Sequence, residues 1–359
     1  MTSSSEASEL STSVWDVRVR LNGHITRSIS DDYWQSIDAE HIACWKDATT
    51  LLGLRALQSN GATISLAANW SPVVRRIKHN TGIQQKLEGL ERGAEYFSLL
   101  RKFKMSPVDI DVAVSMDRPA EPGDLLMSRE YVEYFLSDMF IMLNLSSPAS
   151  FTLYAAKIIT GQKFDSPINI SNYFFDSVSL RSYSGIWPRL KSIPLSDVVS
   201  WYERVRPTVR MSPATRMEKV IFAILHLSDG NVSPVTIVWI FYALETLFDT
   251  SPGENLRIII RRISLLLSPN QKEAAYLRKQ MRELYNIRSA FVHGGLDVIH
   301  PLHNELLDKS VDAMWSKLME AADFGFHILV ASVQEAVRRG WEEIAFKETL
   351  FAGQSESQD

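Results

Sequence analysis

Apolar and polar positions change their spacing near residue 193 of this 359-residue chain. Before that point, stretches of alternating apolar residues are interleaved with stretches of helical spacing. Val17, Val19 and Leu21 alternate with charged residues, and residues 109–114 alternate in the same way. Alternation with a period of two is typical of strands that bury one face. The pattern therefore predicts a mixed α+β domain over residues 13–193.

Within this first part the pattern also places individual elements. Asn22-Gly23 directly follows the first strand and favours a hairpin turn, which predicts a strand pair there. Helices are expected at 31–58, 83–104 and 128–143, where apolar residues recur at near-helical spacing. The segment 172–180 is rich in aromatic and β-branched residues, which favours a strand.

From residue 194 to 350 almost every apolar position follows helical spacing. Proline, glycine and asparagine separate the predicted helices, which span 195–206, 213–228, 234–249, 254–267, 270–293 and 304–348. An all-α bundle is the natural way to bury their apolar faces. The expected fold class is therefore mainly α, with a mixed α+β domain followed by a helical bundle. Residues 1–12 and 351–359 can bury little apolar surface and are expected to be disordered.

Composition restricts the class of protein and its location. Hydrophobic residues make up 45% and charged residues 22% of the chain, as in ordinary globular proteins. The single cysteine, Cys44, excludes an internal disulfide framework and fits a reducing cytosol. The apolar run from Val235 to Leu244 is shorter than the roughly 20 residues that span a bilayer, and it predicts a buried helix. We therefore expect a cytoplasmic protein without a membrane partner.

The formal charge of −4 is unevenly distributed along the chain. Residues 1–200 carry −2, residues 201–300 carry +4 and residues 301–359 carry −6. Residues 255–295 contain eight Lys or Arg residues and two acidic residues. This excess could attract a polyanion such as RNA, or it could simply keep helix faces solvated.

The predicted helix 270–293 carries the most informative chemistry. Pro269 lies at its start and Gly294 just after its end, where a left-handed residue often closes a helix. His293 is then in the last turn, where the negative end of the helix dipole favours an imidazolium. Arg288 lies five residues earlier, or about 140° around the axis. A site that uses both side chains is easier to build at a frayed helix end or across an interface between two copies.

Three stretches carry a resemblance to a known family. They are Tyr242-Ala-Leu-Glu-Thr-Leu-Phe248, the helix from Asn255 to Leu267, and Leu284-Tyr-Asn-Ile-Arg-Ser-Ala-Phe-Val-His-Gly294. In this order they resemble the Apea-like branch of the HEPN superfamily, over roughly 195–345 of the chain. The Arg-x(4–6)-His signature of that superfamily falls on Arg288 and His293. Ser289 follows the arginine where many active members have Asn, Asp or His.

The resemblance implies an endoribonuclease that needs neither a metal nor another cofactor. An imidazole can move the proton of a ribose 2′-OH or of the leaving 5′-oxygen, and a guanidinium can stabilise charge on the phosphorane-like transition state. The implied products are a 2′,3′-cyclic phosphate and a 5′-OH. The implied partners are RNA and a second copy of the chain, because two such domains usually pair around one cleft. A role in prokaryotic defence or as a toxin, regulated by an unknown trigger through the first domain, is a further expectation.

Four residues are supporting candidates. Glu245 lies about 40° from Phe241 around the predicted helix 234–249, at the edge of its apolar face, where a carboxylate needs a partner. That partner could be Arg288, which it would orient, or one of Arg257, Arg261 and Arg262. Tyr285, Asn286 and Ser289 flank Arg288, and Tyr285 could either reach the cleft or pack within the bundle.

Other functions remain open from the sequence. The helical part could be a non-catalytic scaffold that binds RNA or a nucleotide, or that only dimerises. Nucleotidyl-transfer or nucleotide-hydrolase chemistry is less favoured, because no pair of acidic metal ligands is evident. The first part contains no phosphate-binding glycine loop, zinc-ligand spacing or nucleophile elbow that would indicate its role.

Overall fold

A computed structural model of the chain describes residues 12–21, 32–104, 107–159, 165–229, 232–250, 256–300, 302, 304 and 306–347. The two chain ends expected to be disordered lie almost entirely outside these residues, as does the Asn22-Gly23 turn. Among the described residues the fold is mainly helical and includes one antiparallel sheet. The expected combination of a mixed α+β part with a largely helical part is confirmed at this level.

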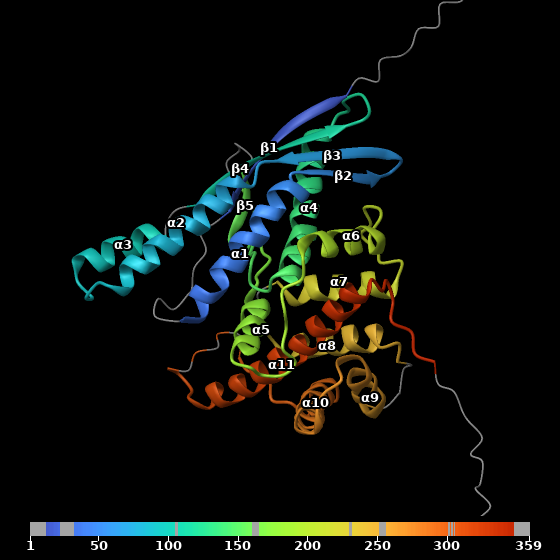
Figure 1. Cartoon of the computed structure of the whole chain (residues 1–359). Helices are drawn as coiled ribbons and strands as arrows, with labels where there is room; N and C mark the ends of the chain where they lie inside the picture. Colours follow the sequence, from blue (N-terminus) through green and yellow to red (C-terminus); the bar gives the residue numbers. More distant parts are fainter. Residues whose placement is uncertain are drawn as a thin grey trace, which may run out of the picture.

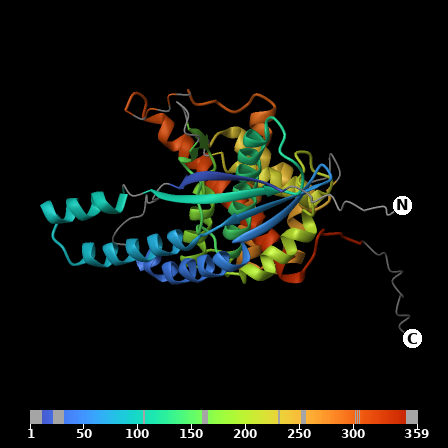
Figure 2. The same ribbon diagram turned by 90° about the horizontal axis from the view of Figure 1, so that it is seen from above.

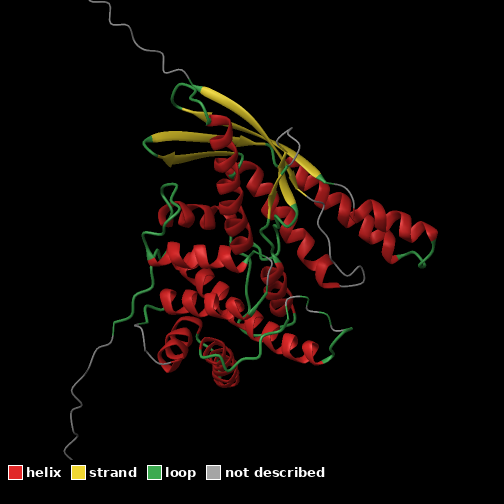
Figure 3. Cartoon of the chain, turned by 180° about the vertical axis from the view of Figure 1, so that it is seen from behind, coloured by secondary structure: helices red, strands yellow, loops and turns green. Residues whose placement is uncertain are grey.

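The sheet forms one end of the molecule (Figures 1 and 3). Its six strands lie in the order β2-β3-β4-β1-β5-β6, and every pair is antiparallel. The strands are β1 (Ser13–Leu21), β2 (Leu54–Ser59), β3 (Ala62–Ala68), β4 (Val108–Met116), β5 (Ala156–Ile159) and β6 (Ser166–Ile168). The neighbours of β1 are therefore β4 and β5, both distant from it in sequence, and its expected hairpin partner lies outside the described residues.

Only one face of the sheet is covered. Val17 and Val19 of β1 are buried against helices, as their alternation with charged residues predicts. Arg18 and Arg20 lie on the other face, where each pairs with an aspartate of β4 at 2.7 Å. Figure 1 shows the helices gathered on the covered side of the sheet.

Eleven helices account for most of the remaining described residues. Those in the first part are α1 (Asp32–Leu51), α2 (Ser71–Glu88), α3 (Ala94–Lys104), α4 (Asp124–Ser146) and α5 (Tyr173–Tyr183). Those that follow are α6 (Leu195–Val205), α7 (Arg216–Leu227), α8 (Pro234–Leu247), α9 (Leu256–Leu267), α10 (Gln271–Val292) and α11 (Ser310–Arg339). All six helices expected after residue 193 are present, although α11 begins six residues later and ends nine residues earlier than its predicted 304–348.

The strand expected at 172–180 is wrong, because this segment forms α5. Phe174 and Phe175 both contact Phe326 of α11, with ring centroids 5.2 and 5.1 Å apart. Val178, one turn later, is buried on the same side of the helix. Packing against α11 thus outweighs the β propensity of the aromatic residues, which is strongly dependent on context.

Two helices expected in the first part are shorter than predicted. The helix expected at 31–58 ends at Leu51, and residues 54–59 form β2 instead. Asn60 and Gly61 have φ of 49° and 79°, which gives the tight turn that joins β2 to β3. The helix expected at 83–104 is divided between α2 and α3, with the chain reversing between them so that both form a hairpin that extends from the body (Figure 2).

A continuous apolar core joins the sheet and the helical bundle in the described part of the chain. It runs through Ile193 and Leu195, where the character of the sequence changes. Gly325 allows α11 to lie close to α8 and α10, because a Cβ there would be 2.7 Å from Ile240 and 2.9 Å from Leu284. This close packing fixes α8 and α10 relative to each other.

Candidate functional site

The start of α10 is fixed by a capping box. The Asn270 side chain accepts hydrogen bonds from the backbone N–H groups of Lys272 and Glu273, each at 3.0 Å. The Glu273 carboxylate accepts a bond from the Asn270 N–H at 2.9 Å. Two backbone donors that a helix start normally leaves free are thereby satisfied, along with that of Asn270.

The end of α10 is fixed by glycine. Gly294 has φ of 72°, in the left-handed region, as its place in the sequence predicts. The Gly295 N–H donates to the Ala290 carbonyl at 2.7 Å, and the Gly294 N–H donates to the Phe291 carbonyl at 3.2 Å. This pair of bonds is the Schellman arrangement, and it sets His293 as the C-cap residue.

Arg288 lies against α8. Its Nη2 is 4.0 Å from the Glu245 carboxylate, and its guanidinium lies over the Phe241 ring at 5.7 Å from the centroid. The Nε atom is buried without a hydrogen-bond partner. The side chain is nevertheless 33% exposed, so part of it reaches solvent. A partly desolvated arginine with open donors is suited to an anion.

Glu245 lies near one of the arginines considered as its partner. Of the four arginines considered, Arg288 lies at ion-pair distance from Glu245. Arg262 has another task, because its Nη1 donates to the carbonyls of Phe248 and Asp249, each at 2.7 Å, after the end of α8. Glu245 is 39% exposed, so its attraction for Arg288 is shared with water and is modest in energy.

The other supporting candidates surround Arg288 on α10. Tyr285 places its ring edge against Phe241 at 6.0 Å and is 38% exposed, so it combines packing with access to solvent. Asn286 is exposed and Ser289 is half-buried. The Ser289 carbonyl accepts the His293 N–H at 3.1 Å, which ties the cap residue to the helix.

His293 is exposed and does not share a face with Arg288 within one chain. Because α10 continues without interruption to Val292, the expected separation of about 140° between the two side chains holds. Arg288 is turned toward α8, whereas His293 is joined to Ser289 through its backbone N–H. The described chain thus presents the two groups on different sides of one helix end.

Exposed cations line α9 and the middle of α10. Arg257 on α9 and Arg278, Lys279 and Arg282 on α10 are all exposed. Glu283, one of the two acidic residues between 255 and 295, is paired with Lys317 at 2.8 Å. The remaining charge gives this surface an attraction for polyanions that decreases with salt.

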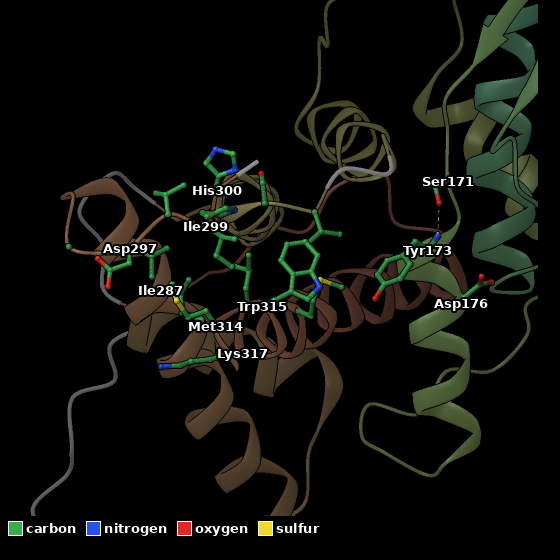
Figure 4. A pocket seen from close by; sticks show the side chains of 18 of the residues that line it. Ser171, Tyr173, Asp176, Ile287, Asp297, Ile299, His300, Met314, Trp315 and Lys317 are labelled. Carbon is green, nitrogen blue, oxygen red and sulfur yellow. Dashed lines mark hydrogen bonds between the residues drawn. The ribbon is translucent and has the colours of Figure 1, made fainter. Parts of the chain in front are cut away.

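An open cavity of about 1050 Å³ lies behind the end of α10 (Figure 4). Ile287 and Gly295 border it, and Trp315 of α11 lies between Tyr173 and the segment that contains Asp297 and His300. Sequence reasoning missed this cavity, because its walls come from segments far apart in the chain. Its size is that of small-molecule sites.

The described residues contain no group of three or more His, Cys, Asp or Glu side chains placed to hold a metal ion. No helix in the described ranges combines the length and apolar character needed to cross a membrane.

Comparison with known proteins adds no relative from which a role could be transferred. Neither a protein-family model, nor a curated protein, nor a solved structure matches this chain.

Proposed function

We propose that this chain is a metal-independent endoribonuclease in which Arg288 and His293 act on the RNA phosphodiester. The observation that carries the proposal is the state of Arg288. Phe241 and Glu245 lie beside its guanidinium, Nε is buried, and a third of the side chain is exposed. A partly desolvated guanidinium that solvent still reaches is suited to bind an anion such as a phosphate.

The chemistry follows from the two side chains. The ribose 2′-oxygen attacks phosphorus while the bond from phosphorus to the 5′-oxygen breaks. His293 takes the proton of the 2′-OH or gives one to the leaving 5′-oxygen. Arg288 stabilises the negative charge on the phosphorane-like transition state, and Glu245 positions Arg288. The products are a 2′,3′-cyclic phosphate and a 5′-OH.

A second copy of the chain completes the site in this proposal. With Arg288 and His293 on different sides of α10, one chain offers only one of the two groups to a given phosphate. A two-fold dimer brings Arg288 of one copy to His293 of its partner and produces two equivalent sites around one cleft. The resemblance to HEPN domains supports the same arrangement.

Exposed apolar residues beside the site fit such an interface. Val292, Val298, Leu302, Leu306 and Leu307 are between 55% and 89% exposed. All five fall within the 16 positions from 292 to 307, which include His293. Clustered exposed apolar side chains are typical of surfaces that bind another protein.

The first part of the chain is proposed to restrain the nuclease. An unregulated ribonuclease would damage its own cell, and the family resemblance suggests defence or toxin systems, in which cleavage follows a trigger. A change in the first part could reach α10 through the continuous core, because α11 packs on both α5 and α10.

Incubation of the purified protein with RNA in EDTA tests this function. We expect cleavage that leaves 2′,3′-cyclic phosphate and 5′-OH ends, and we expect His293→Ala to reduce it by about 10²–10⁴-fold, the usual contribution of general acid–base catalysis. His300→Ala is the matched control, since His300 is also exposed and lies seven residues away. Equal cleavage by wild type and His293→Ala, or cleavage by neither, would reject the proposal.

A binding module without catalysis is the second candidate, and the cavity is the observation that favours it. Its volume of about 1050 Å³ is sufficient for a small ligand beside Trp315. Asp176 and Asp297 line it, and its one lining lysine, Lys317, is paired with Glu283. A nucleotide polyphosphate therefore fits poorly, and a neutral or cationic ligand fits better.

A further inference from the structure

The hairpin of α2 and α3 extends away from the body in two perpendicular views (Figures 1 and 2). The first half of α2 is anchored by Val73, which belongs to the main core. Beyond it, Ile83 and Leu87 form a separate small cluster with Tyr96 and Leu99. Most of the other described side chains of the hairpin are exposed, so they are available to a partner.

The hairpin is strongly basic. Residues 71–104 contain eight Lys or Arg residues and three Glu residues, which gives a net charge of +5 (eight minus three). The whole chain carries −4, so the other residues together carry −9. The hairpin is thus a second basic segment besides residues 255–295, and it projects into solvent.

Three of the described cations of α2 form a stripe that also includes His79. Arg75, Lys78, His79 and Lys86 fall within about 100° of the helix circumference and extend over about 16 Å of its length. All four are exposed. Arg75 and Lys78, three residues apart, repel each other, which disfavours the helix unless an anion lies beside them. No ion pair recorded between described residues involves any of the four.

A hollow of about 460 Å³ lies at the root of this stripe, where Arg75, Arg76 and His79 line it. Arg76 donates from Nη2 to the Pro107 carbonyl at 3.4 Å, while its Nη1 is buried without a partner. The acidic residue of the hollow, Asp109, is held by Arg20 through two bonds of 2.7 Å. Guanidinium groups that line a hollow beside a neutralised carboxylate are suited to a phosphate oxygen.

We propose that the α2–α3 hairpin is an arm that binds the phosphodiester backbone of RNA, with Arg75, Lys78 and Lys86 along the stripe and Arg76 at the root. The choice of RNA as the polyanion rests on the proposed nuclease function. Evenly spaced cations recognise phosphates without reading sequence. No Trp, Phe or Leu is exposed among the described side chains of α2, whereas basic helices that enter a membrane present such a face. On α3, Phe97 is exposed.

RNA binding measured without cleavage tests the arm. The parent is His293→Ala, and the probe is a fluorescein-labelled single-stranded RNA of about 20 nucleotides, titrated between roughly 0.05 and 0.3 M salt. Each single-strand phosphate contact contributes about 0.7 to the salt slope, or about fivefold in affinity at 0.1 M salt. The triple change Arg75→Glu, Lys78→Glu and Lys86→Glu is therefore expected to weaken binding at least 100-fold and to reduce the slope by about 2.

The control carries the same change of charge elsewhere. Lys46, Lys309 and Lys347 are exposed and outside the arm, and their change to glutamate is expected to weaken binding less than fivefold. The unfolding midpoint of each triple variant, followed by circular dichroism, verifies that it is folded. Equal losses in both triple variants would overturn the arm, because net charge would then explain binding.

Three further outcomes separate the arm from a membrane-binding segment and from the nuclease. If the parent does not bind RNA but binds phosphatidylserine vesicles through the arm, RNA is rejected as the ligand and the arm binds a membrane surface. If the wild-type chain cleaves RNA but the arm variant binds RNA as tightly as its parent, the proposed role of the arm is wrong and the proposed nuclease function stands. Arm-dependent RNA binding in a wild-type chain that does not cleave supports the arm and rejects the nuclease.

Discussion

Replacing Arg288 with alanine is expected to slow RNA cleavage by about 10²–10³-fold, the range observed when one charge-stabilising donor is removed from an active site. The guanidinium rests on Phe241 and faces Glu245, so its open donors have a fixed direction. Arg288→Lys should recover only part of the rate. A lysine keeps the charge but has neither the planar fork nor the same contact with the ring.

Initial rates with saturating enzyme in EDTA measure this effect. Arg282→Ala is the matched control, because Arg282 is exposed, lies on the same helix and carries the same charge. We expect Arg282→Ala to act through RNA affinity alone, with a rate at saturation close to that of wild type. Equal slowing by Arg282→Ala and Arg288→Ala would show that the helix supplies only general positive charge.

Replacing Arg206 with methionine is expected to lower the free energy of unfolding by about 3–5 kcal/mol, the usual effect of removing one partner from a buried ion pair. The Arg206 and Asp138 side chains are 2% and 6% exposed and lie 3.0 Å apart. Tyr202 donates its hydroxyl to the same carboxylate at 2.7 Å. Burial raises the pKa of Asp138 despite the adjacent cation, so this carboxyl is not stable as an unpaired charge.

Urea unfolding followed by circular dichroism and by tryptophan fluorescence measures the loss. Asp138 is on α4 and Arg206 follows α6, so the pair joins the two parts of the chain. We expect one transition for both probes, shifted to lower urea in Arg206→Met. The double variant Arg206→Met with Asp138→Leu should recover much of the stability. A loss below about 1 kcal/mol in the single variant would contradict this account of the buried pair.

Local patterns predicted most of the secondary structure, because the period of apolar residues reports which face of an element is buried. The strand β4 and the helices α6 to α10 follow this rule closely. The α5 segment does not, since its aromatic residues suit either a strand or a helix until Phe326 is placed beside them. The Asn60-Gly61 pair favours a hairpin turn. It is not predicted as one, because the helical periodicity of the preceding residues extends past Leu54.

The parts of the candidate site that depend on position along a helix could be predicted from the sequence, and the parts that depend on packing could not. The Gly294 cap and the nearness of Glu245 to Arg288 follow from positions along two helices. The cavity beside Trp315 and the projection of the basic hairpin depend on how distant segments pack, which spacing along a sequence does not report. The order of strands in the sheet is non-local for the same reason.

The most direct test of the account is cleavage by a mixture of two inactive variants. Arg288→Ala and His293→Ala chains are mixed in equal amounts under conditions that allow subunits to exchange, and RNA cleavage is measured in EDTA. If each site takes Arg288 from one copy and His293 from its partner, half of the dimers are mixed and have one intact site of two. The mixture should then regain about a quarter of wild-type activity. Activity no higher than that of the separate variants, with subunit exchange verified, would contradict a site shared between two chains.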